Sequence, residues 1–187
     1  MKLMVILGSS RQGRRGDVVA NWVKSQAEKH GGFELDYVDL RELNLPFYDE
    51  PVSPFDMKSI DDYKRPEGKA WAERVAAAEG YVFITPEYNH GYPGVLKNAL
   101  DWVGPGWVDK PVGLVSYGGV SGGMVAMEQL RQVVIELGLV QVATGMPFNG
   151  IARDAFDANG QPTRPGSAEK FAKILNEIVR LHTVFTK

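Results

Sequence analysis

Mainly apolar runs alternate with amphipathic segments along this chain, and this alternation limits the available folds more than any other feature. Such runs occur at residues 3–7, 81–84 and 112–116. Continuous apolar runs of this length are typical of strands that are buried on both faces of a sheet. In the intervening segments, apolar residues recur at helical spacing. We therefore predict an α/β protein with a parallel sheet and helices on both faces.

Weaker signals complete the same order. Two further strands are predicted at residues 33–40 and 139–143. Helices are predicted around residues 18–27, 66–78, 93–103, 124–137 and 171–185. Residues 41–66 contain several prolines and no sustained period, so we predict a long loop with one short helical turn, and residues 147–165 are predicted to be irregular.

Length and composition fit one globular domain over residues 1–187, because 44% of the residues are apolar and 24% are charged. The formal net charge of −2 argues against a nucleic-acid partner, which needs a surplus of Lys and Arg. The absence of cysteine excludes disulfides, thiolate metal sites and cysteine nucleophiles. No apolar run is long enough for a membrane span or a signal-peptide core, so we expect a cytoplasmic protein without a membrane partner.

Residues 8–16, Gly-Ser-Ser-Arg-Gln-Gly-Arg-Arg-Gly, join the first predicted strand to a helix N-terminus. Free amides and the helix dipole favour an anion there. Ser9 adds a hydroxyl, Arg11 can pair with a phosphate through two hydrogen bonds, and two later arginines add positive charge. The loop has neither a P-loop ending nor a G-x-G-x-x-G fingerprint. It favours phosphate binding, and the alternative is a solvated basic loop.

Residues 86–94, Pro-Glu-Tyr-Asn-His-Gly-Tyr-Pro-Gly, follow the third predicted strand. Two prolines and two glycines fix an unusual backbone whose amides can bond a planar heterocycle. Tyr88 offers an aromatic face, and Asn89 offers both a donor and an acceptor. The alternative is a rigid turn whose tyrosines only pack.

Residues 117–123, Tyr-Gly-Gly-Val-Ser-Gly-Gly, follow the fourth predicted strand. The glycines allow the backbone to approach a ligand closely, or they serve only a tight turn. In an open parallel sheet, ligands bind outside the carboxyl ends of the strands. The three loops together therefore predict a site for a phosphorylated planar aromatic ligand.

These three blocks resemble the NADPH-dependent FMN reductase family. The resemblance lies in the G-S-x-R start at residues 8–11, the P-E-Y-N-H-G-Y-P-G-V-L-K-N-A-L-D block from residue 86, and the glycine turn from residue 117. It spans essentially residues 2–145. It implies a flavodoxin-like three-layer sandwich with a five-stranded parallel sheet of order 2-1-3-4-5, and FMN as the cofactor.

The resemblance also assigns residues to the cofactor. The group at the phosphate comprises Ser9, Arg11, Arg14, Gly16, Asp17 and Val18. The group at the isoalloxazine and ribityl chain comprises Pro86, Glu87, Tyr88 and Asn89, with Gly118 and Gly119 near the ring. A further predicted cofactor-binding residue is Tyr117. Many relatives carry a serine three residues after the arginine, where this chain has Arg14. Whether Arg14 or Arg15 reaches the phosphate therefore stays open.

The resemblance implies a reductase in which FMN accepts hydride from NADPH or NADH and passes electrons to a small acceptor. The acceptor would be a flavin, a quinone, an azo compound or a metal ion, and we expect ping-pong kinetics. We predict no protein nucleophile and no metal site. His90 is the one candidate proton donor, and the alternative is a loop residue without a chemical role.

The resemblance also implies a homodimer or a tetramer. The predicted helix at residues 93–103 is apolar on more than one face, and we expect its second side to pack against a symmetry mate. Tyr92 and Trp102 are predicted to belong to that interface.

Two other functions remain open at this point. A flavodoxin-type electron carrier would be reduced by a partner protein, but such carriers are usually strongly acidic and this chain is not. A nucleotide-binding dehydrogenase would place Asp39, after the second strand, on a ribose, but the glycine fingerprint for that fold is missing.

Overall fold

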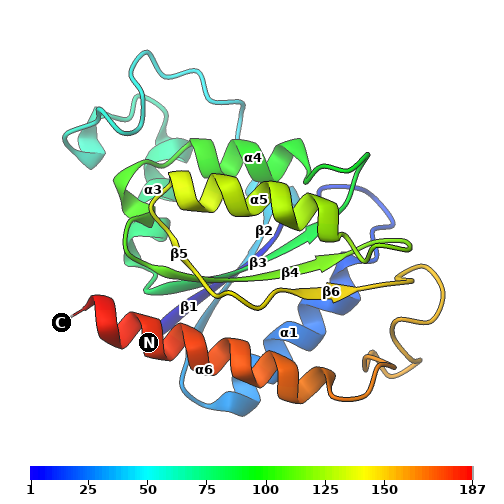
Figure 1. Cartoon of the computed structure of the whole chain (residues 1–187). Coiled ribbons are helices and arrows are strands. Elements are labelled where there is room, and N and C mark those ends of the chain that lie inside the picture. The colour runs from blue at the N-terminus through cyan, green and yellow to red at the C-terminus, as the bar shows by residue number, and fades with distance from the viewer. Residues whose placement is uncertain (187) are drawn as a thin grey trace.

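The computed structural model describes residues 1–186. One sheet lies between two layers of helices (Figure 1). Its main path runs β2 (Glu34–Asp39), β1 (Lys2–Leu7), β3 (Gly80–Pro86), β4 (Pro111–Tyr117) and β5 (Val140–Gln141). All of these neighbours are parallel, so the predicted order 2-1-3-4-5 is confirmed.

The outer edge of the sheet differs from the prediction. The predicted strand at residues 139–143 is only two residues long, and a separate strand, β6 (Met146–Phe148), pairs with β4 further along. We predicted residues from 147 onward to be irregular, which is wrong for Pro147 and Phe148. A three-residue edge strand has no readable period, and its outer side tolerates proline. This second piece carries the chain to the carboxyl edge of the sheet.

The helices divide between the two faces (Figure 1). One face is covered by α1 (Gly16–His30) and α6 (Ser167–Phe185). The other face is covered by α3 (Pro66–Ala77), α4 (Gly94–Asp101) and α5 (Met124–Glu136). Between β2 and α3 we predicted one short helical turn, and the chain forms two: the short α2 (Leu40–Leu43) and a 3-10 turn at Ile60–Asp62. A further 3-10 turn at Pro105–Trp107 follows α4.

The core consists of two apolar clusters, one on each side of the sheet. Successive side chains of a strand point to opposite faces, so β1 contributes to both. Met4 and Ile6 belong to the cluster under α3, α4 and α5, while Leu3 and Val5 pack with α1 and α6. The continuous apolar run thus became a central strand buried on both sides, as predicted.

Most of the second apolar side of α4 is covered by the chain itself. Trp102 is fully buried, and its indole N–H donates to the carbonyl of Pro46 over 2.8 Å. The Oδ1 of Asn98 accepts from the amide of Tyr48 over 3.0 Å, and the hydroxyl of Tyr63 donates to the carbonyl of Trp102 over 2.8 Å. The prediction that Trp102 needs a partner for its burial is therefore wrong, because the long loop after β2 buries it instead. Tyr92 and Val95 are only half-buried, and an interface at these residues stays a prediction.

Within residues 1–186, none of the helices combines the length and apolar character that a crossing of the bilayer would require.

Candidate functional site

A pocket lies at the carboxyl edge of the sheet, where β1, β3, β4 and β6 end. Its lining residues are Arg11, Arg14, Arg15, Pro86, Glu87, Tyr88, Tyr117, Gly118, Gly119, Ile151 and Ala152. The three loops singled out in the sequence therefore meet in one place, as expected for ligand sites in open parallel sheets. Residues 151 and 152 are additions that the sequence analysis missed.

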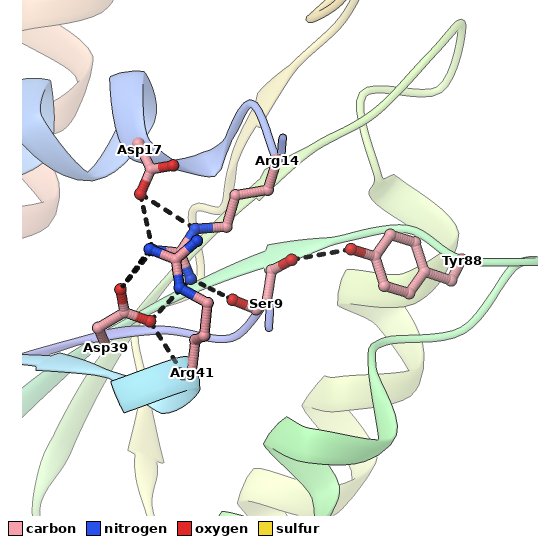
Figure 2. A network of polar contacts seen from close by, with 6 residues as sticks. All are labelled: Ser9, Arg14, Asp17, Asp39, Arg41 and Tyr88. Carbon is pink, nitrogen blue, oxygen red and sulfur yellow. Dashed lines mark hydrogen bonds and ion pairs between the residues drawn. The ribbon is translucent and has the colours of Figure 1, made fainter. Parts of the chain in front are cut away.

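Arg14 is the best-anchored side chain of the first loop (Figure 2). Its guanidinium lies between the carboxylates of Asp17 and Asp39 and also donates to the carbonyl of Ser9. The Nη1–Oδ1 distance to Asp39 and the Nη2–Oδ1 distance to Asp17 are both 2.7 Å. The Arg14 side chain is only 1% exposed. Although Arg14 borders the pocket, its charge is directed into the protein.

Both members of the buried pair are charged. Burial alone would raise the pKa of the Asp39 carboxyl, but hydrogen bonds from Arg14 and from the amide of Arg41 outweigh it and lower that pKa. The hydrogen bond to Asp39 is the main cause that raises the pKa of Arg14. The Asp39 carboxylate is thus committed to Arg14 and to the first turn of α2, and it is not available to a ribose.

Arg11 and Arg15 supply the outward-facing positive charge of the site. Both side chains are exposed, and neither forms an ion pair within residues 1–186. The neighbouring amides of Gly16, Asp17 and Val18 open α1, where the first amides of a helix have no intrahelical acceptor. Arginines beside a helix N-terminus form a favourable environment for an anion.

The hydroxyl of Tyr117 lies under this helix end. A Cβ built on Gly16 would be 2.3 Å from it, so the two residues are in direct contact. The hydroxyl is buried and has no hydrogen-bond partner within residues 1–186. Burial is the main cause that raises its pKa, and the nearby Ser9 hydroxyl, whose hydrogen bond goes to Tyr88, opposes this rise only in part, so the Tyr117 hydroxyl is a neutral donor. A buried hydroxyl without a partner is costly and indicates a missing polar group at this point.

Side chains tie the loops to one another. Ser9 Oγ and Tyr88 Oη share a hydrogen bond over 2.8 Å, which joins the first loop to the second (Figure 2). The Glu87 carboxylate accepts from the Ser121 hydroxyl over 3.1 Å and from the amides of Val125 and Ala126 over 3.0 and 3.2 Å. Glu87 therefore caps α5, whose own cap residue offers no side chain, and joins the second loop to the third.

The second loop makes a tight turn at Asn89 and His90. Both residues have positive φ, 51° and 66°, and the amide and carbonyl of Tyr88 pair with those of Gly91. Asparagine tolerates this left-handed conformation well, which explains one of the two. Both side chains are exposed, and neither lines the pocket. The roles expected for Asn89 at the cofactor and for His90 as a proton donor stay predictions.

The third loop continues into a fourth one. The Gly118 amide donates to the carbonyl of Phe148 over 3.2 Å, and the Ile151 amide donates to the carbonyl of Gly118 over 3.1 Å. The Gly150 amide donates to the carbonyl of Gly119 over 2.8 Å. This pairing, which β6 makes possible, brings Ile151 and Ala152 to the pocket. The only sequence signal was their position after the last strand.

The remaining predicted residues surround the pocket without lining it. Ser9 is fully buried, with its hydroxyl bonded to Tyr88, and Gly16 lies over Tyr117. Asp17 and Val18 belong to the first turn of α1, and Asp17 is held by Arg14. No group of three or more His, Cys, Asp or Glu residues suited to a metal ion occurs in residues 1–186.

Comparison with known proteins agrees with this geometry. The model of the NADPH-dependent FMN reductase family matches residues 1–152. An NAD(P)H-dependent FMN reductase of Schizosaccharomyces pombe is 42% identical over 153 residues, which is 82% of this chain and 74% of that protein. A 2-hydroxy-1,4-benzoquinone reductase of a Burkholderia species is 31% identical, over 86% of this chain and 84% of that protein.

Among solved structures, the flavoenzyme NAD(P)H:(acceptor) oxidoreductase FerB of Paracoccus denitrificans superposes with a TM-score of 0.71. The alignment covers 98% of each chain at 21% identity, which supports the fold. The matched family model spans all six β-strands and every residue that lines the pocket, and together with the sequence relatives it decides the classification. The chain belongs to the NADPH-dependent FMN reductase family.

Proposed function

We propose that the pocket described above is the FMN site of an FMN-dependent NAD(P)H:acceptor oxidoreductase. The cofactor and the reaction are those of the family. The observation that carries the location is the buried, unpartnered Tyr117 hydroxyl beneath the open amides of α1. An anion placed there would satisfy the hydroxyl and the amides at once.

The residues present fit FMN. At the phosphate, Arg11 and Arg15 would pair with the charge, and the first amides of α1 and the Tyr117 hydroxyl would donate hydrogen bonds. At the ring, Pro86, Tyr88 and Ile151 offer apolar contact, and the glycines at 118 and 119 allow close approach of the backbone. Nothing fills the space over Gly119, where an added Cβ would meet no atom within 4 Å.

When bound, FMN would accept hydride from NAD(P)H and pass the electrons to the acceptor, and the protein supplies orientation and electrostatics. In this chain, the hydrogen bonds from Ser9 to Tyr88 and from Glu87 to α5 hold the walls of the pocket in a fixed relation. Such preorganisation lowers the entropic cost of binding a rigid ring.

The first experiment is an absorbance spectrum of the purified protein, before and after anaerobic addition of NADPH or NADH. We expect flavin bands that bleach with at least one donor. Bands that persist with both donors would point to an electron carrier reduced by another protein. A protein that shows no flavin after incubation with FMN would contradict the proposed site.

For the acceptor, we propose small planar oxidants such as quinones, flavins or azo compounds, with metal ions as further candidates. The benzoquinone reductase among the relatives supports the quinone class. Donor and acceptor would use the same exposed ring face in turn, which gives ping-pong kinetics. Initial rates at several fixed quinone concentrations should give parallel double-reciprocal lines in NADPH, and intersecting lines would contradict this order.

We also propose a cytoplasmic homodimer. Access to NAD(P)H supports the location, and fractionation of cells with an antibody would test it. Phe47 and Phe55, which are 82% and 50% exposed on the loop over α4, support an apolar contact between copies. Light scattering of the purified protein measures the mass, and a value of one chain at micromolar concentration would contradict the dimer.

A further inference from the structure

We infer that Arg14 is a positioning residue: it holds the loop at residues 8–16 in place from the buried side and does not touch the phosphate. This inference rests on the FMN site proposed above. Figure 2 shows the arrangement: the guanidinium is enclosed by Ser9, Asp17 and Asp39. It answers the question left open by the sequence, which of the two consecutive arginines faces the anion.

The Arg14 guanidinium has no free hydrogen-bond donor. Its five hydrogen bonds, two to Asp17, two to Asp39 and one to the Ser9 carbonyl, account for every N–H that an arginine carries. A phosphate could be bound only if one of these bonds were broken in a side chain that is 1% exposed. Arg15 is the exposed neighbour and makes no such contacts within residues 1–186.

The contacts of Arg14 join three parts of the structure: the start of the loop at residues 8–16, its end, and β2. Leu7, the last residue of β1, is in register with Asp39, the last residue of β2. Arg14 returns from the far end of the loop to bond Asp39 and the Ser9 carbonyl, and Asp17 belongs to the first turn of α1. One side chain therefore fixes the start of the loop, its end and the neighbouring strand. This fixes where Arg11 and Arg15 enter the pocket.

Arg14 also neutralises negative charge beside the N-terminus of α1. Without Arg14, the carboxylates of Asp17 and Asp39 would lie unneutralised beside the N-terminus of α1 and would repel a phosphate there. Arg14 offsets one of the two negative charges and turns both carboxylates toward itself. The ion pair thus reduces the repulsion between Asp17, Asp39 and an anion bound at the N-terminus of α1.

The test compares the binding of FMN with that of riboflavin, which has the same ring but no phosphate. The variants are Arg14→Met, Asp39→Asn and the double variant Arg14→Met/Asp39→Asn. Loss of one partner of a buried ion pair can prevent folding, so Asp39→Asn, which leaves no uncompensated carboxylate, keeps the test open if Arg14→Met does not fold. Dissociation constants come from quenching of flavin fluorescence on the apoprotein.

We expect Arg14→Met to lose about tenfold or more of the preference for FMN over riboflavin, with riboflavin affinity nearly unchanged. Asp39→Asn should also lose preference, but less, because removal of one negative charge near the phosphate offsets part of the lost anchoring. The double variant should lose no more than the worse single variant, because both changes break the same contact. If Arg14 bound the phosphate directly, Asp39→Asn would release it and leave FMN affinity equal or higher. That result, or additive losses, would overturn the inference.

The matched control is Arg74→Met. Arg74 also forms a bidentate pair with an aspartate of β2, Asp36, but this pair joins β2 to α3, away from the pocket. We expect the control to lower the free energy of unfolding and leave the FMN-to-riboflavin ratio unchanged. A ratio that falls equally in the control would mean a general effect of stability, against the inference.

The wild-type protein separates this inference from the function on which it rests. If the wild type binds riboflavin as tightly as FMN, the phosphate site itself is wrong. If it prefers FMN and the three variants keep that preference, the phosphate site stands and only the role of Arg14 is refuted.

Discussion

The α-carbon of Gly16 and the hydroxyl of Tyr117 are in contact at the base of the loop at residues 8–16, since a Cβ at Gly16 would lie 2.3 Å from the hydroxyl oxygen and 2.8 Å from Cδ1 of Leu7. The contact joins the start of α1 to the end of β4. Only a residue without a side chain lets the helix amides approach the hydroxyl this closely. The contact therefore fixes the position of the Tyr117 hydroxyl relative to the first amides of α1 in the proposed phosphate site.

The first prediction is that Gly16→Ala disrupts this contact. The added methyl group must displace Tyr117 or the start of α1, and overpacking of this kind costs about 1–3 kcal/mol. We expect the free energy of unfolding of the apoprotein to fall by this amount, and FMN affinity to fall with it. Urea unfolding and flavin titration measure the two effects.

The control for that variant is Gly94→Ala. Gly94 opens α4, and a Cβ there would meet no atom within 4 Å. In an unobstructed helical position, alanine is favoured over glycine by up to about 1 kcal/mol. The two substitutions should therefore change stability in opposite directions, and equal destabilisation would show that the Tyr117 contact is not the cause.

The second prediction concerns Tyr117→Phe. In the apoprotein the hydroxyl is buried without a partner, and an unsatisfied group of this kind costs about 1–3 kcal/mol. Its removal should leave the apoprotein as stable as the wild type or more stable, while FMN binding weakens about tenfold through loss of a donor to the phosphate. Riboflavin binding should not change. A variant with less stable apoprotein and normal FMN affinity would assign the hydroxyl a purely structural role.

The sequence was informative where the signal is local. The run at residues 3–7 predicted a buried central strand, and the loops after β1, β3 and β4 predicted the pocket because they follow buried strands. The strand order came from the resemblance and is confirmed. The irregular edge was predicted less well, since β6 is held by β4 and not by its own propensity.

The pairing of Arg14 with Asp39 could not have been predicted from either residue. They are separated by 24 intervening positions, and Arg14 stands next to Arg15, which could have filled the same role. Asp39 even matched the position of a ribose ligand in the rival dehydrogenase reading. Only the register of β1 with β2 brings the aspartate under the loop. The same limit applied to α4, whose cover is a loop some 50 residues earlier in the chain, as in the bond from Tyr48 to Asn98.

The third prediction concerns Glu87, whose carboxylate holds two amides at the start of α5 and the Ser121 hydroxyl. Loss of a helix cap costs about 0.5–2 kcal/mol, so Glu87→Ala should lower the free energy of unfolding by that amount. Glu87→Gln keeps one acceptor oxygen, so its free energy of unfolding should lie between those of Glu87→Ala and the wild type. Glu128→Ala, which removes an exposed ion pair with Arg131 on the same helix, should change it by less than about 1 kcal/mol. Urea unfolding of the apoproteins gives all four values.

The last prediction uses Lys110, which lies away from the pocket, just before β4. Its ammonium donates to the carbonyls of Val75 and Ala76 at the end of α3, over 3.1 and 2.8 Å. Burial lowers its pKa to about 8, against a smaller opposing effect of Glu79. Both the folded and the unfolded chain are therefore protonated here below pH 8, so the cost of burying the charge is fully present at neutral pH.

Between that value and the ordinary lysine value of 10.5, the folded chain binds fewer protons than the unfolded chain. The contribution of Lys110 to stability must therefore rise with pH across this window, and it becomes constant above it. We expect the free energy of unfolding of the wild type, measured relative to Lys110→Met, to be higher at pH 9.5 than at pH 7.5. Urea unfolding of both proteins at the two pH values isolates this residue, because other titrations cancel in the difference. A difference that is unchanged or falls with pH would show that the bonds to α3 keep the ammonium charged despite its burial.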